Sequence, residues 1–211
     1  MNNVKIISVI TGDIVNSSNL DDSQKRIVQD SVSQLNHENI LLKPKFFRGD
    51  SFQLAVKPEI ALIFALKIRA DLIRRNKITD VRVSIGIGEI SFWNEDVLLS
   101  EGPAFERSGK KLDKLKELEV RIAITTGNKE LDEELETYCF LVDVLLRSLS
   151  TVQANVLFYK LDKIPQEEIG KLLKVSQPSV SKTLKAANWK AIEKFIKRYT
   201  QIIEKKYGTF E

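Results

Sequence analysis

Hydrophobic and polar positions in the first 150 residues alternate between strand-like and helix-like patterns. Short apolar runs rich in β-branched residues predict strands at 5–11, 40–47, 52–56, 80–90 and 120–125. Apolar residues recurring on one helical face predict helices at 21–38, 58–75, 102–118 and 132–149. The order β-α-β-β-α-β, followed by one more helix and strand, is the ferredoxin-like arrangement. We therefore expect an α+β fold whose helices cover one face of an antiparallel sheet and leave the other face, or its edge, for a ligand.

From Thr151 onward the pattern becomes purely helical. It predicts four helices, at 151–161, 165–173, 177–187 and about 189–206. Pro165 suits a first helical turn, and Ser176 is a suitable N-cap for the third helix. The expected organisation is thus an α+β domain over 1–127, a connecting helix over 128–150 and a small all-α domain over 151–211.

Residues 168–184 meet the constraints of a helix-turn-helix. Five apolar residues fall where the two helices bury side chains against each other: Ile169, Leu173, Val175, Val180 and Leu184. Gly170 is small where the helices approach. Lys174 stands where glycine is usual, because the turn backbone tends to be left-handed, and it is tolerable there at about 1 kcal/mol. The segment resembles the helix-turn-helix of sigma-factor region four and related regulators.

The outer side of the third helix carries the hydrogen-bonding and phosphate-binding types that groove readout requires. We expect it to contact DNA through Ser176, Gln177, Ser179, Ser181, Lys182 and Lys185. The charge distribution is consistent with DNA binding by this part of the chain. Residues 151–211 hold 12 basic and 6 acidic residues, whereas the remainder is slightly acidic. The alternatives are a solvated lysine-rich surface and a small helical protein-interaction module.

Two aspartates stand at junctions that this topology brings together. Asp13 directly follows the first strand, and Asp50 lies in the predicted hairpin turn at 48–51. Because the first strand and the hairpin are neighbours in a βαββαβ sheet, the two carboxylates are expected to converge. Carboxylate pairs bind Mg²⁺ or Mn²⁺, with phosphates and water completing the shell. The alternative for either aspartate alone is an ordinary turn or helix cap.

The segment Asp13-Ile14-Val15 and the hairpin at 47–52 (FRGDSF) resemble class III nucleotidyl cyclases and the related palm domains of diguanylate cyclases and polymerases. The resemblance implies that Asp13, the Ile14 carbonyl and Asp50 hold metal. It also implies a purine nucleotide, for which the candidate ligands are Asn16, Ser17, Ser18, Lys45, Arg48, Arg107 and Lys110. The alternative for Arg107 and Lys110 is a solvated basic helix face.

The resemblance weakens on the helix predicted at 102–118. Cyclases carry there an asparagine and an arginine that act on the ribose and the transition state. By spacing, Glu106 and Lys110 stand in their places, and a lysine lacks the bidentate fork of arginine. Cyclisation is therefore less expected than binding. The whole chain, with GDIVNS at 12–17, GDSF at 49–52 and GPAF at 102–105, also resembles the bacterial SatD family.

Three functions remain open. The first is a cytoplasmic DNA-binding regulator whose cyclase-like domain binds a purine nucleotide with Mg²⁺; the second is a metal-dependent nucleotidyl cyclase or nucleotidyltransferase with a regulatory tail; the third is a catalytically dead interaction module. The cyclase resemblance implies a homodimer. The lone cysteine, Cys139, and the lack of a signal-peptide pattern fit a cytoplasmic protein, and the longest apolar run, 61–66, is too short to span a membrane.

Overall fold

A five-stranded mixed sheet forms the centre of the computed structural model, which describes residues 6–35, 38–75 and 79–208. The strand order is β2-β3-β1-β4-β5. The strands are β1 (Ile6–Ile14), β2 (Ile40–Phe47), β3 (Ser51–Val56), β4 (Val81–Glu89) and β5 (Ile122–Thr125). The first four pair in antiparallel fashion, whereas β5 runs parallel to β4. The chain is thus an α+β protein, as the pattern predicts, but its sheet is mixed and not purely antiparallel.

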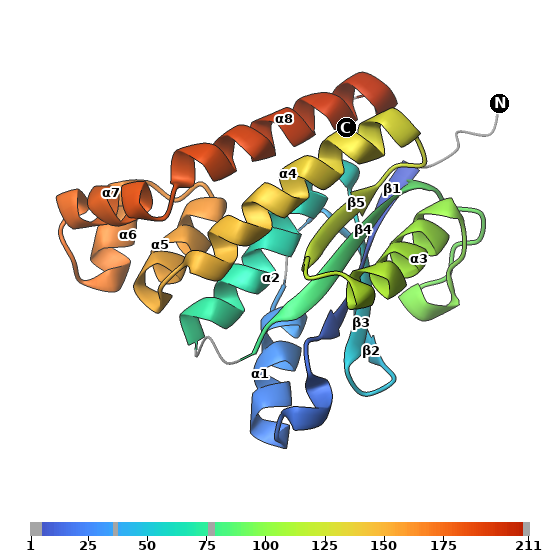
Figure 1. Ribbon diagram of the computed structural model, residues 1–211, viewed down its shortest axis with the longest axis horizontal. Coiled ribbons are helices and arrows are strands. Elements are labelled where there is room, and N and C mark those ends of the chain that lie inside the picture. Colours follow the sequence, from blue (N-terminus) through green and yellow to red (C-terminus); the bar gives the residue numbers. More distant parts are fainter. Residues whose placement is uncertain (1–5, 36–37, 76–78, 209–211) are drawn as a thin grey trace.

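Helices alternate with these strands and then form an uninterrupted C-terminal series (Figure 1). The interleaved helices are α1 (Asp22–Ser33), α2 (Ala61–Arg75), α3 (Pro103–Glu117) and α4 (Lys129–Ser148). The C-terminal helices are α5 (Thr151–Leu161), α6 (Gln166–Leu173), α7 (Gln177–Ala186) and α8 (Trp189–Tyr207). Several bounds follow from local chemistry. Asp21 and Gln24 form a capping box at the start of α1, and Ser176 caps α7.

Both faces of the sheet are covered, which corrects the expectation of an open face. One face packs on α2 and α4 through residues such as Ile10 and Ile85, and the other packs on α3 around Val9 and Ala104. The parallel pairing of β4 with β5 requires a crossover helix, and α3 is that crossover. Gly86 lets α3 approach closely, because a Cβ there would collide with the backbone of α3.

The C-terminal helices share the core of the α+β part. Side chains of α4, α5 and α8 belong to the main hydrophobic cluster, so α4 is part of the core as well as a connector. The buried Tyr199 hydroxyl on α8 donates a 2.6 Å hydrogen bond to the Pro58 carbonyl, and Lys67 on α2 pairs with Asp162 at 2.6 Å. A separate apolar cluster joins α5 to α6 and α7 through Val156, Ile169, Val180 and Leu184. No helix in the described ranges is long and apolar enough to cross a membrane.

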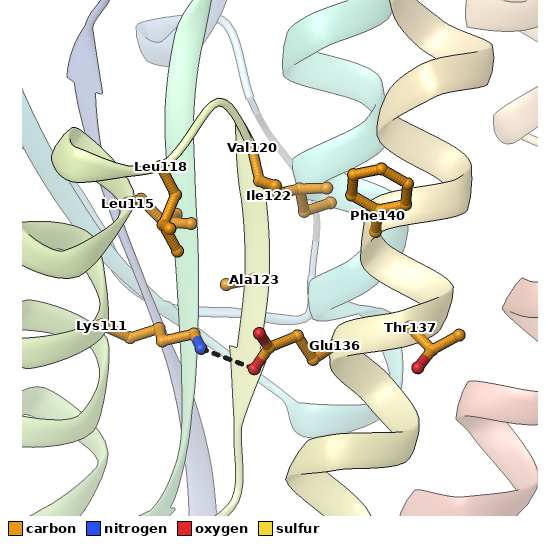
Figure 2. A pocket seen from close by; sticks show the side chains of 9 residues that line it. All are labelled: Lys111, Leu115, Leu118, Val120, Ile122, Ala123, Glu136, Thr137 and Phe140. Atoms are coloured by element: carbon orange, nitrogen blue, oxygen red, sulfur yellow. Dashed lines mark hydrogen bonds and ion pairs between the residues drawn. The ribbon is translucent and has the colours of Figure 1, made fainter.

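β5 is an edge strand, and a groove crosses it between α3 and α4 (Figure 2). The groove is mainly apolar, and the half-exposed Phe140 and Leu118 lie at its sides. Lys111 and Glu136 bridge it with a 3.0 Å ion pair. That ion pair ties α3 to α4 across the open edge of the sheet.

Candidate functional site

The helices α6 and α7 are joined by a tight turn at Lys174–Ser176. The Lys174 backbone has φ 55° and ψ 42°, the left-handed conformation expected at this position. The Val175 amide donates a 2.9 Å hydrogen bond to the Gly170 carbonyl, and a Cβ on Gly170 would lie 2.8 Å from the Val175 carbonyl oxygen. The buried Ile169, Val180 and Leu184 hold the two helices together from inside. The geometry of the turn therefore depends on a small residue at 170.

The outer face of α7 presents every side chain that the sequence assigns to DNA. All six are exposed: Ser176, Gln177, Ser179, Ser181, Lys182 and Lys185. The Ser176 hydroxyl accepts a hydrogen bond from the Ser179 amide at 3.4 Å, which caps the helix. Gln177 donates from Nε2 to Oε1 of Gln166, the first residue of α6, at 2.7 Å. In the described part of the chain, neither Lys182 nor Lys185 forms an ion pair, so both charges are available to a partner.

Asp13 and Asp50 lie close together where β1 ends. The Ile14 amide donates to the Asp50 carbonyl at 3.0 Å, and Ser17 Oγ donates to Asp50 Oδ2 at 2.6 Å. Asp13 is almost fully buried, and its Oδ2 lies 3.4 Å from Arg82 Nη1 and 4.0 Å from Lys116 Nζ. Its other oxygen, Oδ1, is buried and has no hydrogen-bond partner among the described residues.

Electrostatics at Asp13 are unfavourable for an unpaired carboxylate. Burial raises the pKa of Asp13 above its usual value, Arg82 and Lys116 oppose this rise, and the neighbouring Asp50 adds to it. A bound cation would partner the orphaned Oδ1 and offset the repulsion between the two carboxylates. The described residues contain no group of three or more acidic, histidine or cysteine ligands. Carboxylates at Asp13 and Asp50 thus fit a hard divalent ion whose remaining ligands come from solvent or a substrate.

The β1–α1 loop lies next to the two aspartates. Asn16 is exposed and left-handed with φ 54°, and it precedes a short 3₁₀ turn, Ser17–Asn19, in which Ser18 is exposed. Arg48 lies in the hairpin turn two residues before Asp50, with φ 52°, and its guanidinium lies 5.9 Å from the Phe47 ring. Of these candidates, Ser17 bonds Asp50 directly, whereas Asn16, Ser18 and Arg48 are neighbours of the aspartates in the same loop and hairpin turn.

The remaining candidate nucleotide ligands lie apart from this group. Lys45 pairs with Asp96 at 2.5 Å, and Lys110 pairs with Glu106 on the exposed side of α3 at 3.0 Å. Arg107 donates from Nη1 to the Ile87 carbonyl at 2.6 Å. It precedes Lys116, the α3 residue beside Asp13, by nine positions, which is about 13 Å along a helix.

Three arginines that the sequence does not single out lie in and beside a polar pocket behind the β1–α1 loop. Arg69 is fully buried and donates to Asp80 from Nε and Nη2 and to Asp143 from Nη1. Arg121 also pairs with Asp80, and Arg147 Nε lies 3.2 Å from Asp143 Oδ2. Burial opposes ionisation of Asp80, but the pairs with Arg69 and Arg121 outweigh it and hold the pKa of Asp80 below its usual value.

The pocket has a volume of about 460 Å³, within the usual range for small-molecule sites. Its walls come from the β1–α1 loop, the end of α2, the segment before β4, the segment before β5 and the last turn of α4. The lining residues are Val15, Asn16, Asn19, Leu20, Ile73, Thr79, Asp80, Arg121 and Arg147. An arginine within an apolar helix, such as Arg69, is a signal for a buried ion pair, but its partners 11 and 74 residues away are not readable from sequence.

Fold and site together define an α+β protein with a carboxylate pair at the end of its first strand and a helical C-terminal part. The SatD family model matches residues 6–203. The chain therefore belongs to the SatD family. No curated protein and no solved structure matches it.

Proposed function

We propose that this protein is a DNA-binding regulator whose α+β part binds a purine nucleotide together with Mg²⁺ or Mn²⁺. The observation that carries the proposal is the exposed face of α7, a short capped helix with polar and basic side chains, set against α6 by a tight turn. In a helix-turn-helix, the second helix enters the major groove and its N-terminal residues contact base edges. Gln177 and Ser179 occupy that part of α7, and Lys182 and Lys185 follow as phosphate ligands.

The strand arrangement supports a cyclase-like or palm-type domain. β1 lies between β3 and β4 and is antiparallel to both, which is the ferredoxin-like order, with β5 added at the edge. Asp13 at the end of β1 and Asp50 in the β2–β3 hairpin are adjacent in this arrangement. The unpartnered Asp13 oxygen supports a metal ion there, which would neutralise the carboxylates and bind phosphate oxygens.

A two-fold dimer is the assembly that we propose on DNA. Two copies of α7 would then read two half-sites about 34 Å apart, and the bound sequence would be a pseudo-palindrome. A single recognition helix offers few base contacts, so pairing also increases affinity through a higher effective concentration.

The test is sequence-specific binding by the full chain. DNA sequences are selected from a random pool, and their affinity is compared with that of random DNA between 50 and 200 mM salt (roughly the range in which phosphate contacts weaken). We expect selected DNA to bind at least about 10³-fold more tightly than random DNA. Lys182→Gln should weaken binding to selected and random DNA and lower the salt slope by about 1. Lys129→Gln, which changes an exposed lysine at the start of α4, should alter neither the affinities nor the slope. Equal affinity for selected and random DNA at every salt concentration would rule out the proposal that the protein is a sequence-specific regulator.

The alternative is a metal-dependent nucleotidyl cyclase or nucleotidyltransferase with a regulatory tail. The carboxylate pair favours it, but the α3 residues at the positions of the cyclase asparagine and arginine pair with each other as Glu106 and Lys110, away from Asp13. Mass spectrometry of mixtures with ATP or GTP and Mn²⁺ separates the two functions. A product that wild type forms and Asp13→Ala does not form would establish that the protein is an enzyme. Nucleotide binding without any product would support the regulator.

A further inference from the structure

The polar pocket behind the β1–α1 loop carries an excess of positive charge. Arg69, Arg121 and Arg147 supply three charges against two from Asp80 and Asp143. Arg69 is fully buried and bonds both carboxylates with all three of its nitrogens. The uncompensated charge therefore lies on the two outer arginines, because Asp80 and Asp143 are each ion-paired with Arg69 and with one outer arginine. This is the charge pattern of an anion site, not of a second cation site.

The outer arginines retain donors that the protein does not use. Their side chains remain 32% and 34% exposed, and both line the pocket. A guanidinium has five N–H donors in a planar fork. Within the described ranges, Arg121 donates a hydrogen bond only from Nη1, and Arg147 Nε lies 3.2 Å from Asp143 Oδ2 as an ion pair without a hydrogen bond. Each therefore has free N–H groups with which to bind a further anion while its ion pair stays in place.

We propose that this pocket, which neither Asp13 nor Asp50 lines, is a second site that binds the phosphate chain of a nucleotide, with Arg121 and Arg147 as its principal ligands. The side chains of Asn16 and Asn19 line the pocket from the β1–α1 loop and add neutral donors. Guanidinium–phosphate hydrogen bonds are charge-assisted and bidentate, which suits two arginines that are already oriented by buried carboxylates. The nucleotide itself comes from the proposed function, whereas the phosphate chemistry follows from the pocket alone.

The pocket is also placed to affect the helices that carry α7. Arg147 is the second-last residue of α4, and Ser150, three residues later, caps α5 by accepting a hydrogen bond from the Gln153 amide. Val156 of α5 belongs to the apolar cluster that holds α6 and α7. An anion that shares Arg147 with Asp143 changes the interactions of the last turn of α4, immediately before this unit. Phosphate binding is therefore expected to change DNA affinity.

Calorimetric titration of the full chain with pyrophosphate and with ATP, in EDTA and low salt, tests the site. We expect Arg147→Gln to weaken pyrophosphate binding by about tenfold or more, since a hydrogen bond to a charged group contributes about that factor. Arg147→Lys keeps the charge but lacks the planar fork of donors. Its pyrophosphate affinity should therefore lie between those of wild type and Arg147→Gln. Arg75→Gln is the matched control, because Arg75 is 30% exposed and pairs with an aspartate four residues earlier, outside the pocket.

The proposal would be overturned if wild type did not bind pyrophosphate, or if wild type and Arg147→Gln bound it with equal affinity. Equal affinities for pyrophosphate and ATP would support a site that contacts phosphate alone, and tighter ATP binding would support nucleotide recognition at the same place. Because EDTA removes the metal and no DNA is present, this result is independent of the DNA experiment. If the protein binds specific DNA but not pyrophosphate, only the pocket proposal is refuted. If it binds pyrophosphate but no specific DNA, only the DNA-binding function is refuted.

Discussion

Gln177 donates a 2.7 Å hydrogen bond from its side-chain amide to the amide oxygen of Gln166, so the first residues of α7 and α6 hold each other. This bond restrains an exposed side chain at the end of α7 that would enter the groove. It uses one N–H of Gln177 and leaves the amide oxygen and a second N–H. Those two groups form the bidentate pair that glutamine uses to read adenine in the major groove.

The first prediction is therefore a specific preference for adenine. DNA sequences selected by Gln177→Ala should lose the preference for adenine at one position of each half-site, with discrimination reduced by about 5- to 100-fold. Gln166→Ala should reduce the same preference less, because it frees the Gln177 amide without removing it. Lys185→Gln serves as the control, since loss of a phosphate contact weakens binding to all sequences alike. An unchanged base preference in Gln177→Ala would assign readout to other residues of α7.

Asp13 leads to the second prediction, which concerns stability with and without metal. Its buried Oδ1 has no partner in the described structure, and burial raises the pKa of the Asp13 carboxyl, so its charged form is disfavoured in the folded state. Asp13→Asn removes the buried charge, so we expect a melting temperature roughly 2–4 °C above that of wild type in EDTA. Mg²⁺ or Mn²⁺ should raise the melting temperature of wild type but not of Asp13→Asn.

Asp30→Asn, on the exposed side of α1, is the control for this experiment and should leave both measurements unchanged. A metal-induced shift of equal size in wild type and Asp13→Asn would show that Asp13 is not a ligand. A destabilised Asp13→Asn protein in EDTA would show that the pairs with Arg82 and Lys116 outweigh the cost of burial.

Acid stability gives the third prediction. Burial opposes ionisation of Asp71, but the neighbouring Ser31, Arg75 and Arg74 hold its pKa below the usual value, and the pKa of Asp80 is lowered as well. Ionisation therefore stabilises the folded state above the unfolded-chain pKa of about 4, and this stability is lost as the pH falls through the folded-state values. The free energy of unfolding in urea should decrease steadily below about pH 5.

Asp71→Asn tests the source of this pH dependence. Arg74 and Arg75 remain partly exposed, so the variant leaves no fully buried unpaired charge and is expected to fold. Its unfolding free energy should be lower at pH 7 and should fall less steeply in acid than that of wild type. Equal slopes for the two proteins would assign the acid sensitivity to other carboxylates.

Local signals in the sequence predict the elements better than their arrangement. Asp21, Pro58 and Ser176 mark the starts of helices at or within a few residues of where the structure has them, because caps and proline act on neighbouring backbone atoms. The strand at β5 is predicted, but its parallel pairing with β4 and the placement of α3 are not, since a crossover depends on contacts distant in sequence. Gly86 and Gly88 were the available signal, because glycines two apart in a strand leave one face open to close approach.

The sequence likewise predicts some residues of the candidate site and misses others. Asp13 and Asp50 are recognisable because one follows a predicted strand and the other lies in a predicted hairpin turn, and the strand order brings them together. Arg107 is also a candidate phosphate ligand by sequence, but its Nη1 donates to the Ile87 carbonyl. Arg121 and Arg147 have no motif, and only the pairing of Arg69 with Asp80 and Asp143 places them around one pocket.

The turn residue Lys174 gives the last prediction, which separates backbone strain from side-chain contacts. Its φ of 55° is unfavourable for a residue with a Cβ, and its side chain is exposed. Lys174→Gly should therefore raise the free energy of unfolding by about 1 kcal/mol, measured in urea. Lys171→Gly, the same change three residues earlier within α6, should lower it by about 1 kcal/mol because the helical backbone there is regular. Opposite signs for one substitution at two nearby lysines would establish that the turn is strained, and a loss of stability in both would show that the Lys174 side chain makes a stabilising contact instead.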